Sequence, residues 1–301
     1  MTYIIENANI LKGRETKISS LLVHNGQITA IKQSFKRYAY MKMNVSSFIM
    51  TSTPILLKNS LPMQSSYIEM KNYFIQEFIL KGCTTFLTIA NIHSESVLQT
   101  ELKRLKARLL NCPMDYIIGV QIPIRLITQS FLRKCKREKV PAIFVEIQQM
   151  DELYQLPWGW IREAMFPYNS PLIPVFLTDN LREKKQFQLK WQKLMEEEKI
   201  PFIENELNED EPLANSILAK IGIYPFKGNI QHGQELSYNL YMKSTEIEMI
   251  EEMELFSYHN NKLAVTVHKG EVIRANEQIL FRPGFGEHVK IKTPSYIKID
   301  V

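Results

Sequence analysis

A change of pattern along the 301-residue chain constrains its fold more than any single motif. In the middle section, short apolar runs alternate with stretches of helical periodicity, which is typical of βα units on a parallel sheet. The two end sections are instead rich in short strands separated by turn signals. We therefore expect a parallel α/β unit in the middle of the chain and one β-domain built from both ends.

The end sections carry clear hairpin signals. Asn25-Gly26 separates the apolar runs 20–24 and 27–31, and a type I′ turn favours this pair because both central residues need a positive φ. Near the other end we predict a short helix at 214–221, then strands at 228–230, 236–242, 254–258, 263–267 and 271–273. Residues 1–48 and 222–301 are thus predicted to form a small composite β-sandwich.

The middle section, residues 49–221, predicts a shortened TIM-like (β/α) barrel of about six units. The expected strands are 49–58, 84–89, 116–122, 142–147, 172–177 and 201–205, and the expected helices are 70–80, 95–110, 130–139, 159–165 and 182–198. The section holds about 170 residues against about 250 for a complete eight-unit barrel. The missing part falls between Asn205 and Ala214, and the sequence leaves open whether the barrel is open or repaired.

Composition excludes several classes of function. Hydrophobic residues make up 45% and charged residues 23%, which is ordinary for a globular protein. No apolar run reaches the roughly 18 residues of a membrane span, and the N-terminus lacks signal-peptide features, so we expect a cytoplasmic protein with no membrane contact. The net charge of +5 and basic runs on predicted helices indicate solvated helix faces and no nucleic-acid partner.

The cysteines give no metal or disulfide pattern. Cys83, Cys112 and Cys135 are far apart, and without a CxxC spacing they predict neither a zinc ribbon nor a disulfide framework. Cys83 is expected to be a small buried residue. No GxSxG, P-loop or HExxH motif is present, and we therefore expect no cofactor.

Several local patterns resemble one known family. The run 3–10 followed by 21–31, the segment Lys81-Gly82-Cys83-Thr84-Thr85, the stretch 217–233 and the hairpin 265–273 are similar, in this order, to the dihydroorotase and hydantoinase branch of the amidohydrolase superfamily. This resemblance implies a metal-dependent hydrolase of cyclic amides, built as a barrel flanked by a β-sandwich that both chain ends form.

The resemblance also implies metal ligands that this chain lacks. The family has a His-x-His pair at the end of its first barrel strand, and the matching positions are Leu57 and Asn59. It has a carboxylated lysine on the fourth strand, where this chain offers Glu146, and histidines on the fifth and sixth strands, for which 175–179 and 202–206 offer none. The aspartate of the eighth strand falls in the missing part. We therefore predict no metal.

Polar residues at the expected strand ends are the candidate site, because the active face of such barrels lies there. They are Lys58, Asn59, Asn91, Gln121, Glu146, Thr178, Asp179 and Glu204. Glu146 is able to take the place of the carboxylated lysine. A simpler interpretation is a buried ion pair of Lys58 with Glu146 or Asp179.

Three functional hypotheses follow. The first is a catalytically inactive amidohydrolase-like protein with a structural, regulatory or ligand-binding role. The second is a divergent hydrolase of a cyclic amide or other C–N bond that uses Glu146, Asp179 or Glu204 for acid–base catalysis. The third is a binding module unrelated to the family. An opened barrel exposes strand edges, so a homodimer or a protein partner is expected to cover them.

Overall fold

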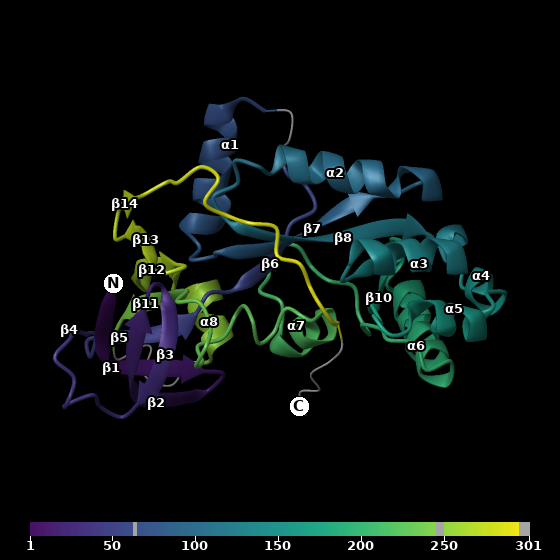
Figure 1. The fold of residues 1–301 in the computed structure, drawn as a ribbon. Coiled ribbons are helices and arrows are strands. Elements are labelled where there is room, and N and C mark those ends of the chain that lie inside the picture. The colour runs from purple at the N-terminus through teal and green to yellow at the C-terminus, as the bar shows by residue number, and fades with distance from the viewer. Residues whose placement is uncertain (63–64, 245–249, 295–301) are drawn as a thin grey trace.

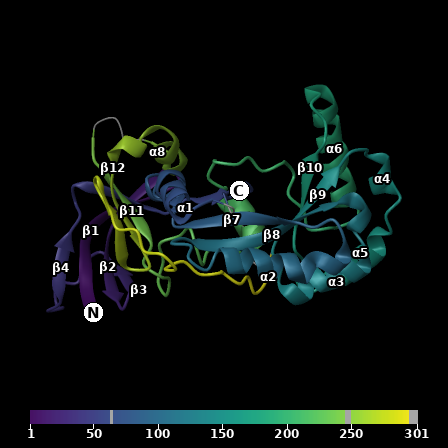
Figure 2. The same ribbon diagram turned by 90° about the horizontal axis from the view of Figure 1, so that it is seen from above.

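Two sheets stand side by side in the molecule. The computed structural model describes residues 1–62, 65–244 and 250–294. A nine-stranded mixed sheet lies at one end of the molecule and a five-stranded parallel sheet at the other (Figure 1, Figure 2). The mixed sheet contains strands from both ends of the chain, and the parallel sheet contains strands from the middle.

The mixed sheet joins the two ends of the chain. Its order is β14-β13-β12-β11-β5-β1-β2-β3, with β4 paired to β1. The central strand β5 lies parallel to β1 and antiparallel to β11, and so connects the N-terminal and C-terminal halves. The strands are β1 (Thr2–Lys12), β2 (Glu15–His24), β3 (Gln27–Lys32), β4 (Met41–Asn44), β5 (Phe48–Ser52), β11 (Tyr238–Met242), β12 (Leu263–His268), β13 (Glu271–Ala275) and β14 (Gln278–Ile279).

Two hairpin turns from opposite chain ends meet in this sheet. Asn25 and Gly26 have φ values of 48° and 73°, which confirms the predicted turn between β2 and β3. Lys269 and Gly270 form the turn between β12 and β13 with φ values of 50° and 81°. A Cβ on Gly26 would lie 2.8 Å from the Lys269 carbonyl oxygen. Glycine is therefore required here by close backbone approach as well as by φ.

The parallel sheet curls into part of a barrel. Its order is β10-β9-β8-β7-β6, and its strands are β6 (Ile55–Leu57), β7 (Thr85–Asn91), β8 (Asp115–Pro123), β9 (Ile143–Ile147) and β10 (Leu172–Phe176). The helices of this part are α1 (Tyr67–Phe74), which continues as a π-helical turn (Ile75–Ile79), α2 (Leu98–Arg108), α3 (Gln129–Glu138), α4 (Asp151–Tyr154), α5 (Trp158–Met165), α6 (Leu181–Glu197) and α7 (Asn215–Ile221).

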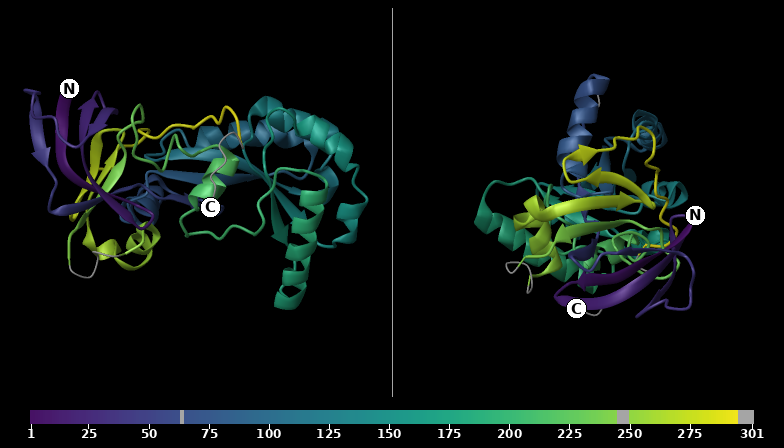
Figure 3. Two further views of the ribbon diagram at one scale, coloured as in Figure 1. Left: turned by 90° about the horizontal axis from the view of Figure 1, so that it is seen from below. Right: turned by 90° about the vertical axis from the view of Figure 1, so that its left-hand side faces the viewer.

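Each face of the parallel sheet has its own apolar core. Helices α1 to α6 bury residues such as Phe131 and Trp191 against the outer face. The inner face, which would line the interior of a complete barrel, packs against Leu218 and Ile221 of α7. Figure 3 shows α7 lying across this face. One short helix therefore fills space that further barrel strands would otherwise surround.

Residues 201–213, which we call the closing segment, join the two edges of the parallel sheet. At the β10 edge, the Leu172 amide donates to the Pro201 carbonyl at 2.9 Å, and the Ile203 amide donates to the Leu172 carbonyl at 2.9 Å. At the β6 edge, the Leu213 amide donates to the Ile55 carbonyl at 2.8 Å. The chain itself thus satisfies backbone groups on both edge strands, and the shortened barrel is repaired here by irregular backbone.

Two expected barrel strands differ from the structure. Residues 201–205 run beside β10 but form a single bridge, Leu172 to Phe202, so the sheet has five strands among the described residues rather than six. The expected strand 49–58 is divided at Pro54 into β5 and β6, which belong to different sheets. Proline cannot donate to a ladder, so a break at this position is physically reasonable.

Two expected strands of the C-terminal section are also wrong. Residues 228–230 form no strand, and residues 254–258 belong to helix α8 (Glu252–Tyr258). A capping box explains the helix. The Glu251 side chain accepts from the backbone of Glu254, whose own side chain accepts from the Glu251 amide. Such reciprocal bonds satisfy amides that a helix start otherwise leaves unpaired.

Candidate functional site

The carboxyl ends of β8 and β9 bring together two predicted site residues. Gln121 and Glu146 are half-buried, and the Gln121 side-chain amide donates to the Glu146 carboxylate at 2.8 Å. Side chains alternate along a strand, so these residues share the inner face with Ile117 and Phe144. The two side chains thus form a hydrogen-bonded polar pair near the carboxyl ends of two neighbouring strands.

The end of β6 presents an apolar side chain to the same inner face. Leu57 is 1% exposed and belongs to the core that contains Leu218 of α7. Asn59, two residues further on, is exposed. The first of the two positions that match the family's His-x-His pair is therefore part of the packed interior.

Lys58 points to the other face and holds the closing segment in place. Its ammonium contacts Glu77 at 2.8 Å and forms a close ion pair with Asp210, while Lys81 also contacts Glu77 at 2.8 Å. The predicted pairing of Lys58 with Glu146 or Asp179 is wrong. Burial lowers the pKa of Lys58, but the bonds to Asp210 and Glu77 outweigh burial and raise that pKa above its ordinary value. Lys58 is therefore a charged structural anchor.

The other predicted residues lie at strand ends without forming one cluster. Asn91 is exposed at the end of β7, and Asp179 is exposed after β10. The Thr178 hydroxyl donates to Glu183 of α6 at 2.5 Å. Glu204 is exposed and lies 3.7 Å from the Lys220 ammonium of α7. Of the predicted set, hydrogen bonding joins Gln121 and Glu146.

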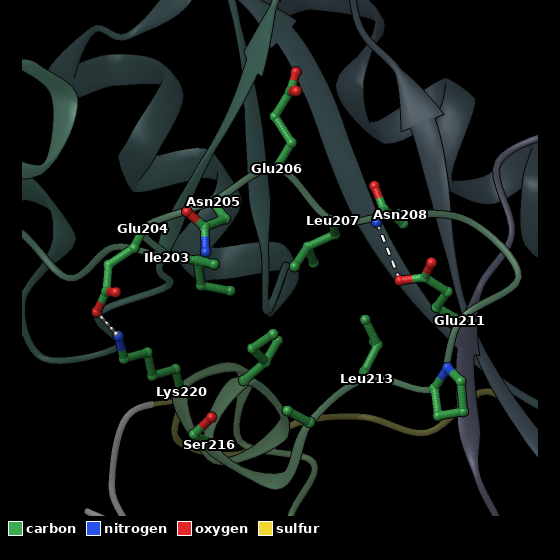
Figure 4. A pocket seen from close by; sticks show the side chains of 13 residues that line it. Ile203, Glu204, Asn205, Glu206, Leu207, Asn208, Glu211, Leu213, Ser216 and Lys220 are labelled. Carbon is green, nitrogen blue, oxygen red and sulfur yellow. Dashed lines mark hydrogen bonds and ion pairs between the residues drawn. The ribbon is translucent and has the colours of Figure 1, made fainter. Parts of the chain in front are cut away.

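A cavity of about 290 Å³ lies between the closing segment and α7 (Figure 4). Leu207 and Leu213 contribute apolar wall, and Glu204 and Lys220 face each other at its rim. Glu206 points away from the cavity, and its carboxylate accepts from the Phe176 amide at 2.6 Å. The sequence pointed to this region through its missing barrel strands, but it did not predict a cavity.

One group of side chains has the composition of a metal site, and it lies at the opposite end of the parallel sheet. Asp115 begins β8, His268 ends β12, and Glu235 precedes β11, with one ligand atom from each within 4.8 Å of the others. The Lys227 ammonium, however, lies 2.5 Å from both carboxylates. This lysine takes the position of a cation, so the residues present fit an ammonium better than a divalent ion.

Asp115 is the centre of this cluster. It is 0% exposed and accepts from the Glu287 amide at 2.8 Å, while the Lys269 ammonium lies at 2.7 Å. Burial alone would raise the pKa of Asp115, but its interactions with His268 and Lys227 outweigh burial and hold that pKa well below its ordinary value. No sequence signal indicated this cluster, because its members come from distant segments and match no spacing motif.

The cysteines are buried, as predicted for Cys83. Cys83, Cys112 and Cys135 are all free and buried, and burial raises the pKa of each thiol well above its ordinary value. A protonated, enclosed thiol is a poor nucleophile and a poor metal ligand. These residues therefore contribute packing.

Comparison with solved structures identifies the architecture. The fold is similar to that of a D-hydantoinase (14% identity, TM-score 0.59, covering 97% of this chain and 99% of that chain). It is also similar to the dihydropyrimidinase from Brevibacillus agri NCHU1002 (11%, 0.62, 97% and 99%) and to the D-hydantoinase (dihydropyrimidinase) from Thermus sp. (10%, 0.64, 98% and 100%). No protein-family model matches the sequence, and no curated protein matches it. The likeness at these identities establishes a hydantoinase-like fold.

None of the described helices is both long enough and apolar enough to cross a membrane.

Proposed function

We propose that this chain is a hydantoinase-like protein without metal-dependent hydrolase activity, whose role is structural, regulatory or ligand-binding. The observation that carries the proposal is the packing of Leu57. The family resemblance assigns a metal-binding histidine to this position. Here the position holds an apolar side chain that is buried in the same core as residues of α7. Neither Leu57 nor the amide of Asn59 supplies the imidazole, thiolate or carboxylate that zinc prefers.

The distribution of charged groups gives further support. In the Gln121–Glu146 pair, the ionisable group is the carboxylate of Glu146. A single carboxylate without imidazole ligands makes a poor transition-metal site. The cluster around Asp115, which does contain a histidine, is already neutralised by Lys227 and Lys269. In both places the side chains serve contacts between chain segments.

A turnover assay tests the proposal. Purified protein is incubated with hydantoin, dihydrouracil or dihydroorotate in the presence of added Zn²⁺, Mn²⁺ or Co²⁺, with a D-hydantoinase run in parallel. We expect no turnover above the uncatalysed rate for this chain and robust turnover for the control enzyme. Metal-dependent turnover that chelators abolish and that metal restores would overturn the proposal.

A divergent hydrolase, with or without one metal ion, is the second candidate, and the placement of Glu146 favours it. This half-buried carboxylate lies on the inner face at the carboxyl end of β9, where general acid–base groups of such barrels are found. If this candidate is right, a Glu146→Gln variant loses turnover of a cyclic amide while it keeps its fold. Equal rates for the variant and the wild type would exclude Glu146 as the base.

A homodimer or a protein partner at the shortened barrel also stays a proposal. The closing segment bonds to both edges of the parallel sheet, so any such partner would cover the outside of this segment rather than bare strands. Sedimentation velocity over a range of concentrations distinguishes the cases. A concentration-dependent shift to a dimer supports self-association, and a constant monomer argues against it.

A further inference from the structure

A separate cavity of about 230 Å³ lies between the two sheets. It is remote from the Gln121–Glu146 end of the parallel sheet, because Ile55 at the start of β6 forms part of its wall. Leu218 of α7 and Phe256 of α8 add further apolar surface. Cavities at the junction of two structural units, with mostly apolar walls and a few convergent polar groups, are typical ligand sites.

The polar groups of this cavity converge on Glu252, the first residue of α8. The Ser52 hydroxyl donates to one carboxylate oxygen at 2.7 Å, and the Gly13 amide donates to the other at 3.1 Å. Both donors are neutral. Burial raises the pKa of Glu252, and it outweighs the hydrogen bonds from Ser52 and Gly13 and the charge of Lys12, which lower that pKa. Glu252 is therefore a shielded carboxylate that the protein holds in one orientation.

No basic side chain pairs with Glu252 among the described residues. Those that line the cavity include Glu251 and Glu252 and no lysine, arginine or histidine. The nearby Lys12 ammonium lowers the pKa of Glu252 through its charge, but it forms no ion pair with that carboxylate and donates to the Tyr224 hydroxyl at 3.0 Å. Glu251 already has a partner, because it pairs with Arg14 at 3.2 Å. A half-buried carboxylate without an ion-pair partner is costly, and a positively charged ligand would reduce this cost.

We propose that the cavity binds a small organic amine in its ammonium form, with the charge on Glu252 and the apolar remainder against Leu218 and Phe256. A cavity of this size holds a ligand of roughly ten non-hydrogen atoms. The proposal uses none of the residues on which the proposed function depends. A failure of one is therefore independent of a failure of the other.

Benzylamine and its neutral counterpart benzyl alcohol test the proposal. Isothermal titration of the full chain is expected to give saturable benzylamine binding with a dissociation constant on the order of 1 mM. Benzyl alcohol has a similar shape but no charge. It is expected to bind about tenfold more weakly, because its hydroxyl can donate to the Glu252 carboxylate but brings no positive charge to pair with it.

Two variants and one matched control locate the binding. Glu252→Gln keeps the shape of the side chain and removes its charge, and it should weaken benzylamine binding by about tenfold or more. Met253→Trp fills the rim from a residue that is 40% exposed and should also weaken binding without disturbing the interior. Glu254→Gln changes an exposed carboxylate of the same helix that does not line the cavity, and it should bind benzylamine within about twofold of the wild type.

Several results would overturn the proposal. Absence of saturable benzylamine binding, equal affinity for benzylamine and benzyl alcohol, or equal effects of the Glu254 and Glu252 substitutions each contradict a charge-selective site. If Glu252→Gln fails to fold, Met253→Trp decides. Undiminished binding by that variant would show that benzylamine binds elsewhere.

Discussion

The two ends of the parallel sheet bury charge in different ways. At the amino ends of the strands, Asp115 is completely enclosed and contacts Lys227 and Lys269. At the carboxyl ends, the Lys58 side chain is 7% exposed, but its partner Asp210 is 52% exposed. An enclosed charge that loses a partner stays unpaired, whereas a charge near the surface recovers water. We therefore expect the two clusters to differ in how much stability each carries.

The largest expected effect is that of Asp115→Asn. This change removes the charge between two lysines and should lower the free energy of unfolding by about 3–5 kcal/mol, as the breaking of a buried ion pair usually does. Urea denaturation followed by circular dichroism measures it. The control is Glu287→Gln, a partner of Lys269 whose side chain is 73% exposed, and its expected cost is below about 1 kcal/mol. Equal losses in the two variants would contradict the contrast between enclosed and exposed partners.

Acid pH should weaken the same cluster. The folded pKa of Asp115 lies below its ordinary value of 3.8, so its contribution is present above that pH and is lost as the pH falls towards the folded pKa. Below about pH 3.8, each pH unit should reduce the free energy of unfolding by up to about 1.4 kcal/mol through this group. Urea titrations of the wild type and Asp115→Asn between about pH 4 and 2.5 isolate the contribution of Asp115 to the free energy of unfolding. If the free energy of unfolding has the same pH dependence in both proteins, Asp115 does not cause the loss of stability in acid.

A smaller effect is expected at the other end of the sheet. Lys58→Met keeps the apolar stem and removes the ammonium that holds Glu77 and Asp210. The expected loss is about 1–2 kcal/mol, because Lys81 still contacts Glu77 and Asp210 regains water. Hydrogen exchange should accelerate in residues 206–210, where the closing segment meets β6. A loss as large as that of Asp115→Asn would contradict the comparison, and Lys81→Met serves as a milder control.

The smallest expected effect is that of Glu146→Gln. The Gln121 amide retains a carbonyl acceptor at this position, and the site is half-buried. We expect a change in the free energy of unfolding within about 0.5 kcal/mol, measured by thermal and urea unfolding. A loss above about 2 kcal/mol would place Glu146 with Asp115 among the enclosed charges.

Local sequence signals predicted the regular parts of the fold. The alternation of apolar runs and helices located β7, β8, β9 and β10 within a few residues, because a buried parallel strand is set by its own apolar run. The Asn25-Gly26 turn was predictable for a local reason as well, since its conformation depends on two adjacent residues. The position of Gln121 and Glu146 at strand ends followed from the same strand boundaries.

The remaining features depend on contacts between distant segments. The partners of Lys58 were missed because Asp210 belongs to irregular backbone whose path no periodicity describes. The cluster of Asp115 with His268 was missed because β8 and β12 lie in different sheets. The few apolar residues of helix α8 were interpreted as a strand. The capping box at its start favours a helix instead. Tertiary placement determined the first two outcomes, and a local capping box determined the third.

The metal content of the purified protein tests most directly whether this chain has a binding site for a catalytic metal ion. Untagged protein is dialysed against micromolar Zn²⁺, Mn²⁺ or Co²⁺, passed through a desalting column and analysed by inductively coupled plasma mass spectrometry. With Leu57 and Asn59 at the family's ligand positions, we expect far less than about one ion per chain. About one tightly held ion per chain, lost in a Glu146→Gln variant, would contradict the proposed function.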